Sequence, residues 1–132
     1  MLVDSSVWID HYAGRHSAVC GVLREALASG RPIFVTDIIV VEVLQGFRSD
    51  GDFDTAAGQL PKFPRLALDD KGHLAAAGLS RQLRAKGVNF GSVIDILIAQ
   101  IALTHNQPLL TGDAGFKRIS EHTNLRLLVQ PA

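Results

Sequence analysis

Residues 93–103 read VIDILIAQIAL, an almost continuous apolar run of helical length that a folded chain would bury. Ser92, directly before the run, is a good helix N-cap, so we expect a helix from Ser92 to about residue 105. Asp95 interrupts the run near its start. An ionised carboxylate is rarely buried without a partner, because its removal from water costs several kcal/mol or more. The position therefore suggests a site that uses buried negative charge.

A second acid interrupts an apolar run in the same way. Glu42 lies within IIVVEVL, residues 38–44, in a helix that Thr36–Asp37 is expected to cap. Asp95 alone has an ordinary explanation, because Ser92 and Asp95 have the spacing of a capping box. That explanation does not cover Glu42, which stands in mid-helix among aliphatic residues.

Short strand candidates alternate with helix candidates along the chain. The strand candidates are MLV at 1–3, IFV at 33–35, LAL at 66–68, PLLT at 108–111 and LRLLV at 125–129. Two helix candidates begin at caps, one at Ser5–Ser6 and one at Thr36–Asp37. Others are expected at 17–29, within 48–63, from Asp69–Asp70 to about 86, and at 92–105, and a last one follows GDAGF at 112–116. Strands separated by helices are typical of parallel α/β sheets. We therefore predict one domain over residues 1–132, an α/β three-layer α/β/α sandwich with a mainly parallel five-stranded sheet.

The composition excludes several classes of protein. The 13 Lys and Arg residues balance the 13 Asp and Glu residues, so no overall field attracts the chain to nucleic acid or membranes. The single Cys20 excludes an internal disulfide framework and a cysteine-based zinc site. No apolar run approaches the ~18 residues of a membrane span, and the N-terminus lacks a secretion-signal pattern. We therefore expect a cytoplasmic protein without membrane contact.

Four acids are expected to meet at one edge of the predicted sheet. Ligands bind at the carboxyl ends of parallel strands, and these acids follow strand candidates or lie on helices that begin after loops at that edge. Converged carboxylates repel one another unless a hard cation gathers them. Oxygen ligands favour Mg²⁺ or Mn²⁺ over zinc, and such ions commonly serve phosphodiester hydrolysis. The candidate catalytic and metal-binding residues are Asp4, Glu42, Asp95 and Asp113.

These acids stand in four stretches that resemble, in order and spacing, the PIN-domain ribonucleases. The stretches are LVDSSVWID at 2–10, VVEVLQG at 40–46, DILIAQIAL at 95–103 and LLTGDAGF at 109–116. The resemblance covers essentially the whole chain and is closest to the VapC toxins of bacterial toxin–antitoxin pairs. Each motif alone is weak, whereas four in the right order are fairly specific.

The resemblance implies a fold and a function. It implies an endoribonuclease toxin that hydrolyses an RNA substrate with Mg²⁺ (or Mn²⁺), forms a homodimer and binds a cognate VapB-type antitoxin. Asp4, Glu42 and Asp95 would be the primary metal ligands, and Asp113 would bind the metal through water or orient the nucleophile. The products would carry 5′-phosphate and 3′-hydroxyl ends. The family often has a further acid two residues after the last one, but Gly115 stands there, so a second metal position would be weak or filled only with substrate.

Other interpretations remain open. A haloacid-dehalogenase-like phosphotransfer domain needs a second Asp two residues after Asp4, where Ser6 stands, and a receiver-like domain needs a phosphoacceptor that LALDD at 66–70 imitates only loosely. The third alternative is a catalytically silent binding module. Taken singly, Asp4 would cap the first helix and Asp113 would be a turn residue.

Polar residues near the four acids have two readings. Ser6 and Thr111 would hold ligands or water, or would be only a helix cap and a strand-end hydroxyl. The basic residues Arg81, Arg84, Lys86, Lys117 and Arg118 would contact phosphates, or would be scattered surface charge. The apolar fraction of 47% is high for a small domain and indicates a partner surface or a well-buried core.

Overall fold

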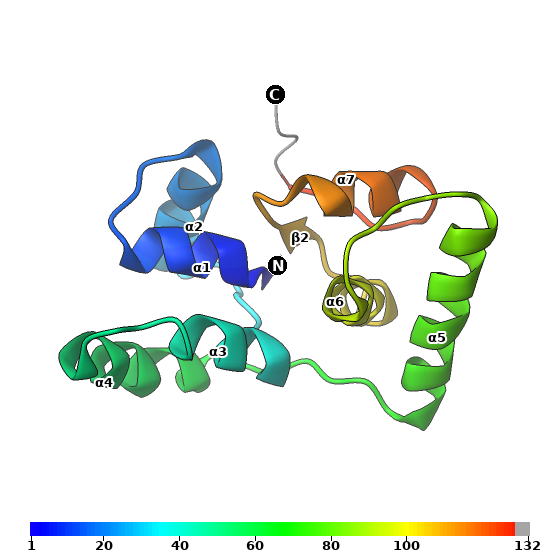
Figure 1. Cartoon of the computed structure of the whole chain (residues 1–132). Helices are drawn as coiled ribbons and strands as arrows, with labels where there is room; N and C mark the ends of the chain where they lie inside the picture. The colour runs from blue at the N-terminus through cyan, green and yellow to red at the C-terminus, as the bar shows by residue number, and fades with distance from the viewer. Residues whose placement is uncertain (129–132) are drawn as a thin grey trace.

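The computed structural model describes residues 1–128 and has a parallel sheet at its centre (Figure 1). Strand β1 (Leu2–Val3) pairs with strand β2 (Leu109–Leu110), with Leu2 opposite Leu109. Isolated parallel bridges add residue 34 beside Leu2, residue 65 beside Val35 and residue 127 beside Leu109. The paired segments therefore lie in the order 65, 34–35, 2–3, 109–110, 127.

The strands are shorter than the sequence predicted. Five strands were expected, but among residues 1–128 only β1 and β2 pair with each other over two consecutive residues, and the other segments form isolated bridges. The other segments make few ladder bonds; Val35, for example, donates from its N to Pro64 O (3.0 Å) and accepts at its O from Leu66 N (2.9 Å). Apolar sequence reports burial rather than the number of ladder bonds, so the strand lengths were overestimated. The α/β class and the parallel orientation are confirmed, and Val129 lies outside the described residues.

Helices cover both faces of this sheet (Figure 1). On one face lie α1 (Ser5–Tyr12), α2 (Ala18–Ser29), α3 (Asp37–Leu44) and α4 (Asp50–Gln59), followed by the 3₁₀ helix η1 (Leu60–Lys62). On the other face lie α5 (Asp70–Ala85), α6 (Val93–Thr104) and α7 (Ala114–Glu121). This is the three-layer arrangement that the sequence predicted.

Polar caps set the starts of α3 and α5. Thr36 Oγ1 accepts a hydrogen bond from Ile39 N (3.1 Å), and Asp69 Oδ1 accepts one from Gly72 N (2.8 Å). Each bond satisfies a backbone donor that has no partner inside the helix. Both caps agree with the sequence-based prediction.

The first helix begins differently from the prediction. Ser5 and Ser6 were expected to cap it, but both lie inside α1. The N-cap residue is Asp4, whose side chain makes no capping bond. The reading of Asp4 as a mere cap is therefore wrong, and its carboxylate is available to other partners.

The core lies between the sheet and the helices. The buried residues of α6 are Ile96, Ile98, Ala99, Ile101 and Ala102. Trp8 and the free thiol of Cys20 are buried on the opposite side of the sheet. Removing such apolar surface from water stabilises the fold by about 25 cal/mol per Å². No described helix is long and apolar enough to cross a membrane.

Candidate functional site

The four candidate acids reach one region from four separate segments. Asp4 follows β1, Asp113 follows β2 after Thr111 and Gly112, Glu42 lies on α3, and Asp95 lies in the first turn of α6. Burial is the main cause that raises the pKa of Asp4, Glu42 and Asp95, and neighbouring carboxylates of the set raise it further. The acids are therefore close enough to repel one another.

Asp4 is the most deeply buried of the four, with 4% of its surface exposed. Its Oδ2 accepts hydrogen bonds from Ser6 Oγ (2.8 Å) and Thr111 Oγ1 (2.9 Å). Burial raises the pKa of Asp4, the two hydroxyl bonds lower it in part, and the charge of Asp113 raises it. Because Oδ2 receives both short bonds, Oδ1 is the oxygen with more free acceptor capacity.

Ser5 connects Asp4 to Glu42. Its Oγ lies 3.4 Å from Asp4 Oδ1 and 3.2 Å from Glu42 Oε1. A hydroxyl donates one proton, so it serves one of these two carboxylates at a time. Burial raises the pKa of Glu42, the bond from Ser5 lowers it, and the charges of Asp4 and Asp95 raise it. The sequence pointed to Ser6 but not to Ser5, whose contact with Glu42 depends on how α1 packs against α3.

Asp95 both caps α6 and belongs to the acidic group. Ser92 N donates to Asp95 Oδ2 and Asp95 N donates to Ser92 Oγ, both at 3.4 Å, which completes the predicted capping box. Burial is the largest cause that raises the pKa of Asp95, and the charges of Asp113 and Asp4 add to it against the lowering effect of Ser92. These long capping bonds leave the carboxylate free to act elsewhere.

Gly91 makes room for the Asp95 carboxylate. Its φ of +85° is a left-handed conformation that favours glycine. A Cβ at this position would lie 2.8 Å from Asp95 Oδ2, which is closer than real Cβ contacts. The backbone conformation therefore favours glycine here, and any larger residue would also push the Asp95 carboxylate from its position.

Asp113 caps α7 at the other side of the site. Its Oδ1 accepts a hydrogen bond from Gly115 N (2.8 Å), and its own N donates to Thr111 Oγ1 (3.0 Å). Thr111, which is 3% exposed, therefore joins Asp113 to Asp4 through one hydroxyl. A Cβ at Gly115 would lie 3.3 Å from Asp113 Oδ1, so any side chain at this position would require the Asp113 carboxylate to shift.

No basic partner neutralises the four acids within residues 1–128. The ion pairs found there join Arg15 to Asp10 and Arg65 to Asp37. As arranged, no three or more acidic, histidine or cysteine side chains in that range are placed to hold a metal ion together. The donor set still suits a hard divalent cation, because it offers carboxylate oxygens and such an ion would relieve the repulsion.

Known proteins resemble this chain along most of its length. The PIN domain family matches residues 1–122. The VapC ribonuclease Mb1587 of Mycobacterium bovis is 30% identical over 128 residues, which cover 96% of each chain. Ribonuclease VapC11 of Mycobacterium tuberculosis has the same identity and coverage.

A solved structure supports the fold independently. The crystal structure of VapBC2 from Rickettsia felis bound to a DNA fragment from their promoter has a TM-score of 0.75 to this chain. The match covers 96% of this chain and 95% of the chain in that structure, and the two sequences are 22% identical. At this identity the likeness bears on the fold alone, and it agrees with the three-layer arrangement.

Proposed function

This chain belongs to the PIN domain family, and from this premise we propose that it is a VapC-type ribonuclease toxin of a VapBC-type toxin–antitoxin pair. It would hydrolyse RNA phosphodiester bonds with Mg²⁺ or Mn²⁺ held by Asp4, Glu42, Asp95 and Asp113. The observation that carries the proposal is the gathering of four acids beside the carboxyl ends of β1 and β2, where neighbouring carboxylates raise the pKa of Asp4, Glu42 and Asp95 further than burial does alone. The haloacid-dehalogenase-like and receiver-like alternatives belong to other families and lose their basis.

The chemistry of the acids supports a divalent cation as cofactor. Asp4, Glu42 and Asp95 would be its direct ligands. Asp4 would bind through Oδ1, because its Oδ2 already accepts two short hydrogen bonds. When bound, the ion would act as a Lewis acid that polarises the scissile phosphate. Neutralising these carboxylates would also offset the cost of gathering them.

The chain's own side chains would prepare the reaction. Ser6 and Thr111 hold the carboxylate of Asp4 in one orientation, so the ligand does not have to be ordered during catalysis. Asp113 Oδ1 accepts the hydrogen bond from Gly115 N, which leaves Oδ2 for another partner. We propose that Oδ2 accepts a hydrogen bond from the attacking water and so orients it. The leaving group would be the ribose 3′-oxygen.

Incubation of the purified protein with total RNA tests this function. We expect discrete cleavage products with Mg²⁺ or Mn²⁺, and uncut RNA when EDTA removes the ion, because carboxylates alone do not polarise a phosphate. The products should carry 5′-phosphates. Their ends are checked by ligation to an adapter that requires a 5′-phosphate. RNA that stays intact with either metal, while the protein still binds it, would favour the catalytically silent binding module.

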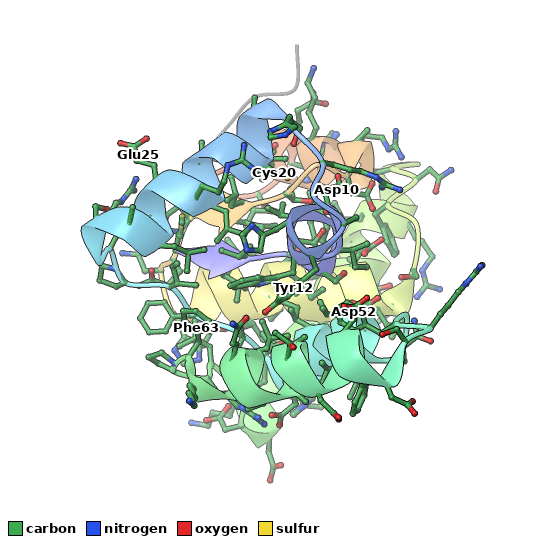
Figure 2. The ribbon with its side chains drawn as sticks, turned by 90° about the vertical axis from the view of Figure 1, so that its left-hand side faces the viewer. Asp10, Tyr12, Cys20, Glu25, Asp52 and Phe63 are labelled. Carbon is green, nitrogen blue, oxygen red and sulfur yellow. The ribbon has the colours of Figure 1, made fainter. Side chains whose placement is uncertain are left out.

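The proposed partners are a second copy of the chain and a VapB-type antitoxin. Several large apolar side chains are exposed: Leu74 (74%), Val93 (68%), Val41 (63%), Ile9 (42%) and Leu27 (38%). Val7 and Trp8 of α1 are part of the core. A groove beside α1 remains accessible and is lined by Trp8, Tyr12, Leu27, Lys62 and Phe63. Figure 2 shows Tyr12 between α1 and α4, where its hydroxyl donates to Gln59 (3.1 Å).

A measurement of mass and activity tests these partners. We expect light scattering at tens of micromolar to give the mass of a dimer, in which a second copy would cover some of these exposed apolar side chains. Addition of the antitoxin encoded beside this chain should stop RNA cleavage at one antitoxin per toxin chain. A monomer at that concentration would contradict the dimer. Full cleavage in the presence of bound antitoxin would contradict the inhibitory role.

A further inference from the structure

Beside the acidic site lies a hollow that the four acids do not line. Its lining residues are Arg84, Gly87, Val88, Asn89, Phe90 and Gly91, which belong to the end of α5 and to the loop before α6. Figure 1 shows this loop leaving the top of α5 and passing beside α7 before it enters α6. The hollow is open to solvent, since Arg84, Gly87, Asn89 and Gly91 are exposed.

Hydrogen bonds hold one arginine that lines this hollow and a second that is bonded to one of its lining residues. Arg118 of α7 donates from its Nε to Asn89 O (2.5 Å), which holds the guanidinium against the loop. Arg84 donates from its Nη2 to Ser80 Oγ (3.0 Å), one turn back along α5. Each arginine therefore uses one nitrogen for position and has further donors left over.

The loop also lies next to the acids. Gly91 is the residue whose Cβ would lie 2.8 Å from Asp95 Oδ2. A Cβ at Gly115 would lie 3.5 Å from Phe90 O and 3.3 Å from Asp113 Oδ1. The hollow is thus continuous with the side of the site formed by Asp95 and Asp113.

The two guanidinium groups are not paired with these acids. The ion pairs in the described part of the chain involve neither Arg84 nor Arg118. Neither arginine contributes to the charges that act on Asp4, Glu42 and Asp95. Their positive charge is therefore available to an anion that lies beside the acids. Arginine suits phosphate because its planar donors match two phosphate oxygens.

From this geometry we infer that Arg84 and Arg118, fixed around residues 87–91, form a subsite for the RNA phosphate next to the scissile one. The inference rests on the proposed function, because it assigns part of the path of the RNA strand. The acids would hold the reacting phosphate through the cation, and the neighbouring phosphate would take the charge of the two arginines. Contacts of this kind set the register of the strand without reading its sequence.

The test measures RNA binding without cleavage. Fluorescence anisotropy with labelled random-sequence single-stranded RNA in EDTA gives the affinity, and a KCl titration gives its salt dependence. Arg84→Gln and Arg118→Gln should each weaken binding about tenfold. Each should lower the slope of log K against log salt by about 0.7, and the double variant by about 1.4. Arg31→Gln is the matched control, because Arg31 lies near the N-terminal amine, at the opposite end of β1 from Asp4.

A conservative variant separates charge from loop anchoring. Arg118→Lys keeps the charge but loses the Nε bond to Asn89, so it should retain most of the salt slope that Arg118→Gln loses. The inference is overturned if Arg84→Gln and Arg118→Gln bind as the wild type does, or if Arg118→Lys and Arg118→Gln weaken binding equally with an unchanged slope. Cleavage by the wild type with Mg²⁺ is measured in parallel. If the variants overturn the subsite but the wild type still cleaves RNA, only the subsite is rejected. A wild type that neither binds nor cleaves RNA rejects the proposed function as well.

Discussion

Asp4→Asn is expected to reduce RNA cleavage by roughly a thousandfold while the fold survives. The substitution keeps the shape of the side chain, and its amide oxygen can still accept a bond from Ser6 or Thr111. What it removes is the negative charge that would bind the cation. Initial rates on a defined RNA with Mn²⁺, compared with circular dichroism of the same samples, measure both quantities.

Glu25→Gln provides a matched control for this experiment. It removes one negative charge from an exposed position on α2, and Figure 2 shows Glu25 projecting away from the body of the molecule. Its cleavage rate should equal that of the wild type. If folded Asp4→Asn cleaves as fast as Glu25→Gln, then Asp4 does not take part in catalysis and the assignment of the site fails.

The fold was predictable where burial decides the structure. The apolar segments around Leu2, Phe34 and Leu109 predicted the parallel sheet, and Thr36 and Asp69 predicted helix starts correctly. Strand length was not predictable, because it depends on how many backbone bonds each neighbour completes. The helix α1 was predicted, but its N-cap residue was wrong, because Asp4, Ser5 and Ser6 all favour an N-cap and sequence cannot choose among them.

The candidate site was predictable as a set of positions but not as an arrangement. Asp4, Glu42 and Asp95 were picked out because each acid ends or interrupts an apolar run. The contact of Ser5 with Glu42 could not be predicted, because it joins two helices and the local sequence does not determine how those helices pack. From the sequence, Asp95 was either a helix cap or an acid gathered with the others, whereas in the structure it caps α6 and also lies near Asp4 and Asp113.

The stability of the metal-free protein should depend on pH in an unusual direction. The pKa values of Asp4, Glu42 and Asp95 are raised mainly by burial, so the folded state takes up protons before the unfolded state does as pH falls. These acids therefore oppose folding above their raised pKa values, and the penalty disappears as pH falls through those values towards the ordinary carboxyl pKa of about 4. In EDTA, the contribution of these groups should raise the melting temperature as pH is lowered from neutral into this range.

Mn²⁺ should reverse that dependence. An ion at a hundredfold excess over its Kd stabilises the folded state by about 2.7 kcal/mol, which is roughly 10 °C in melting temperature for a chain of this size. The gain should be largest at neutral pH and should shrink as pH falls, because protons compete with the ion for the same carboxylates. Differential scanning fluorimetry at several pH values, with EDTA and with Mn²⁺, measures both effects.

Asp95→Asn identifies the origin of these effects. The variant loses one repelling charge, but its amide oxygen can still accept the bond from Ser92 N, so the cap of α6 is kept. In EDTA at neutral pH it should melt above the wild type, and with Mn²⁺ it should gain much less. Glu25→Gln should follow the wild type in every condition. If Asp95 were only a helix cap, Asp95→Asn would melt no higher than the wild type in EDTA and would gain as much from Mn²⁺, and the carboxylate site would then have to be sought without it.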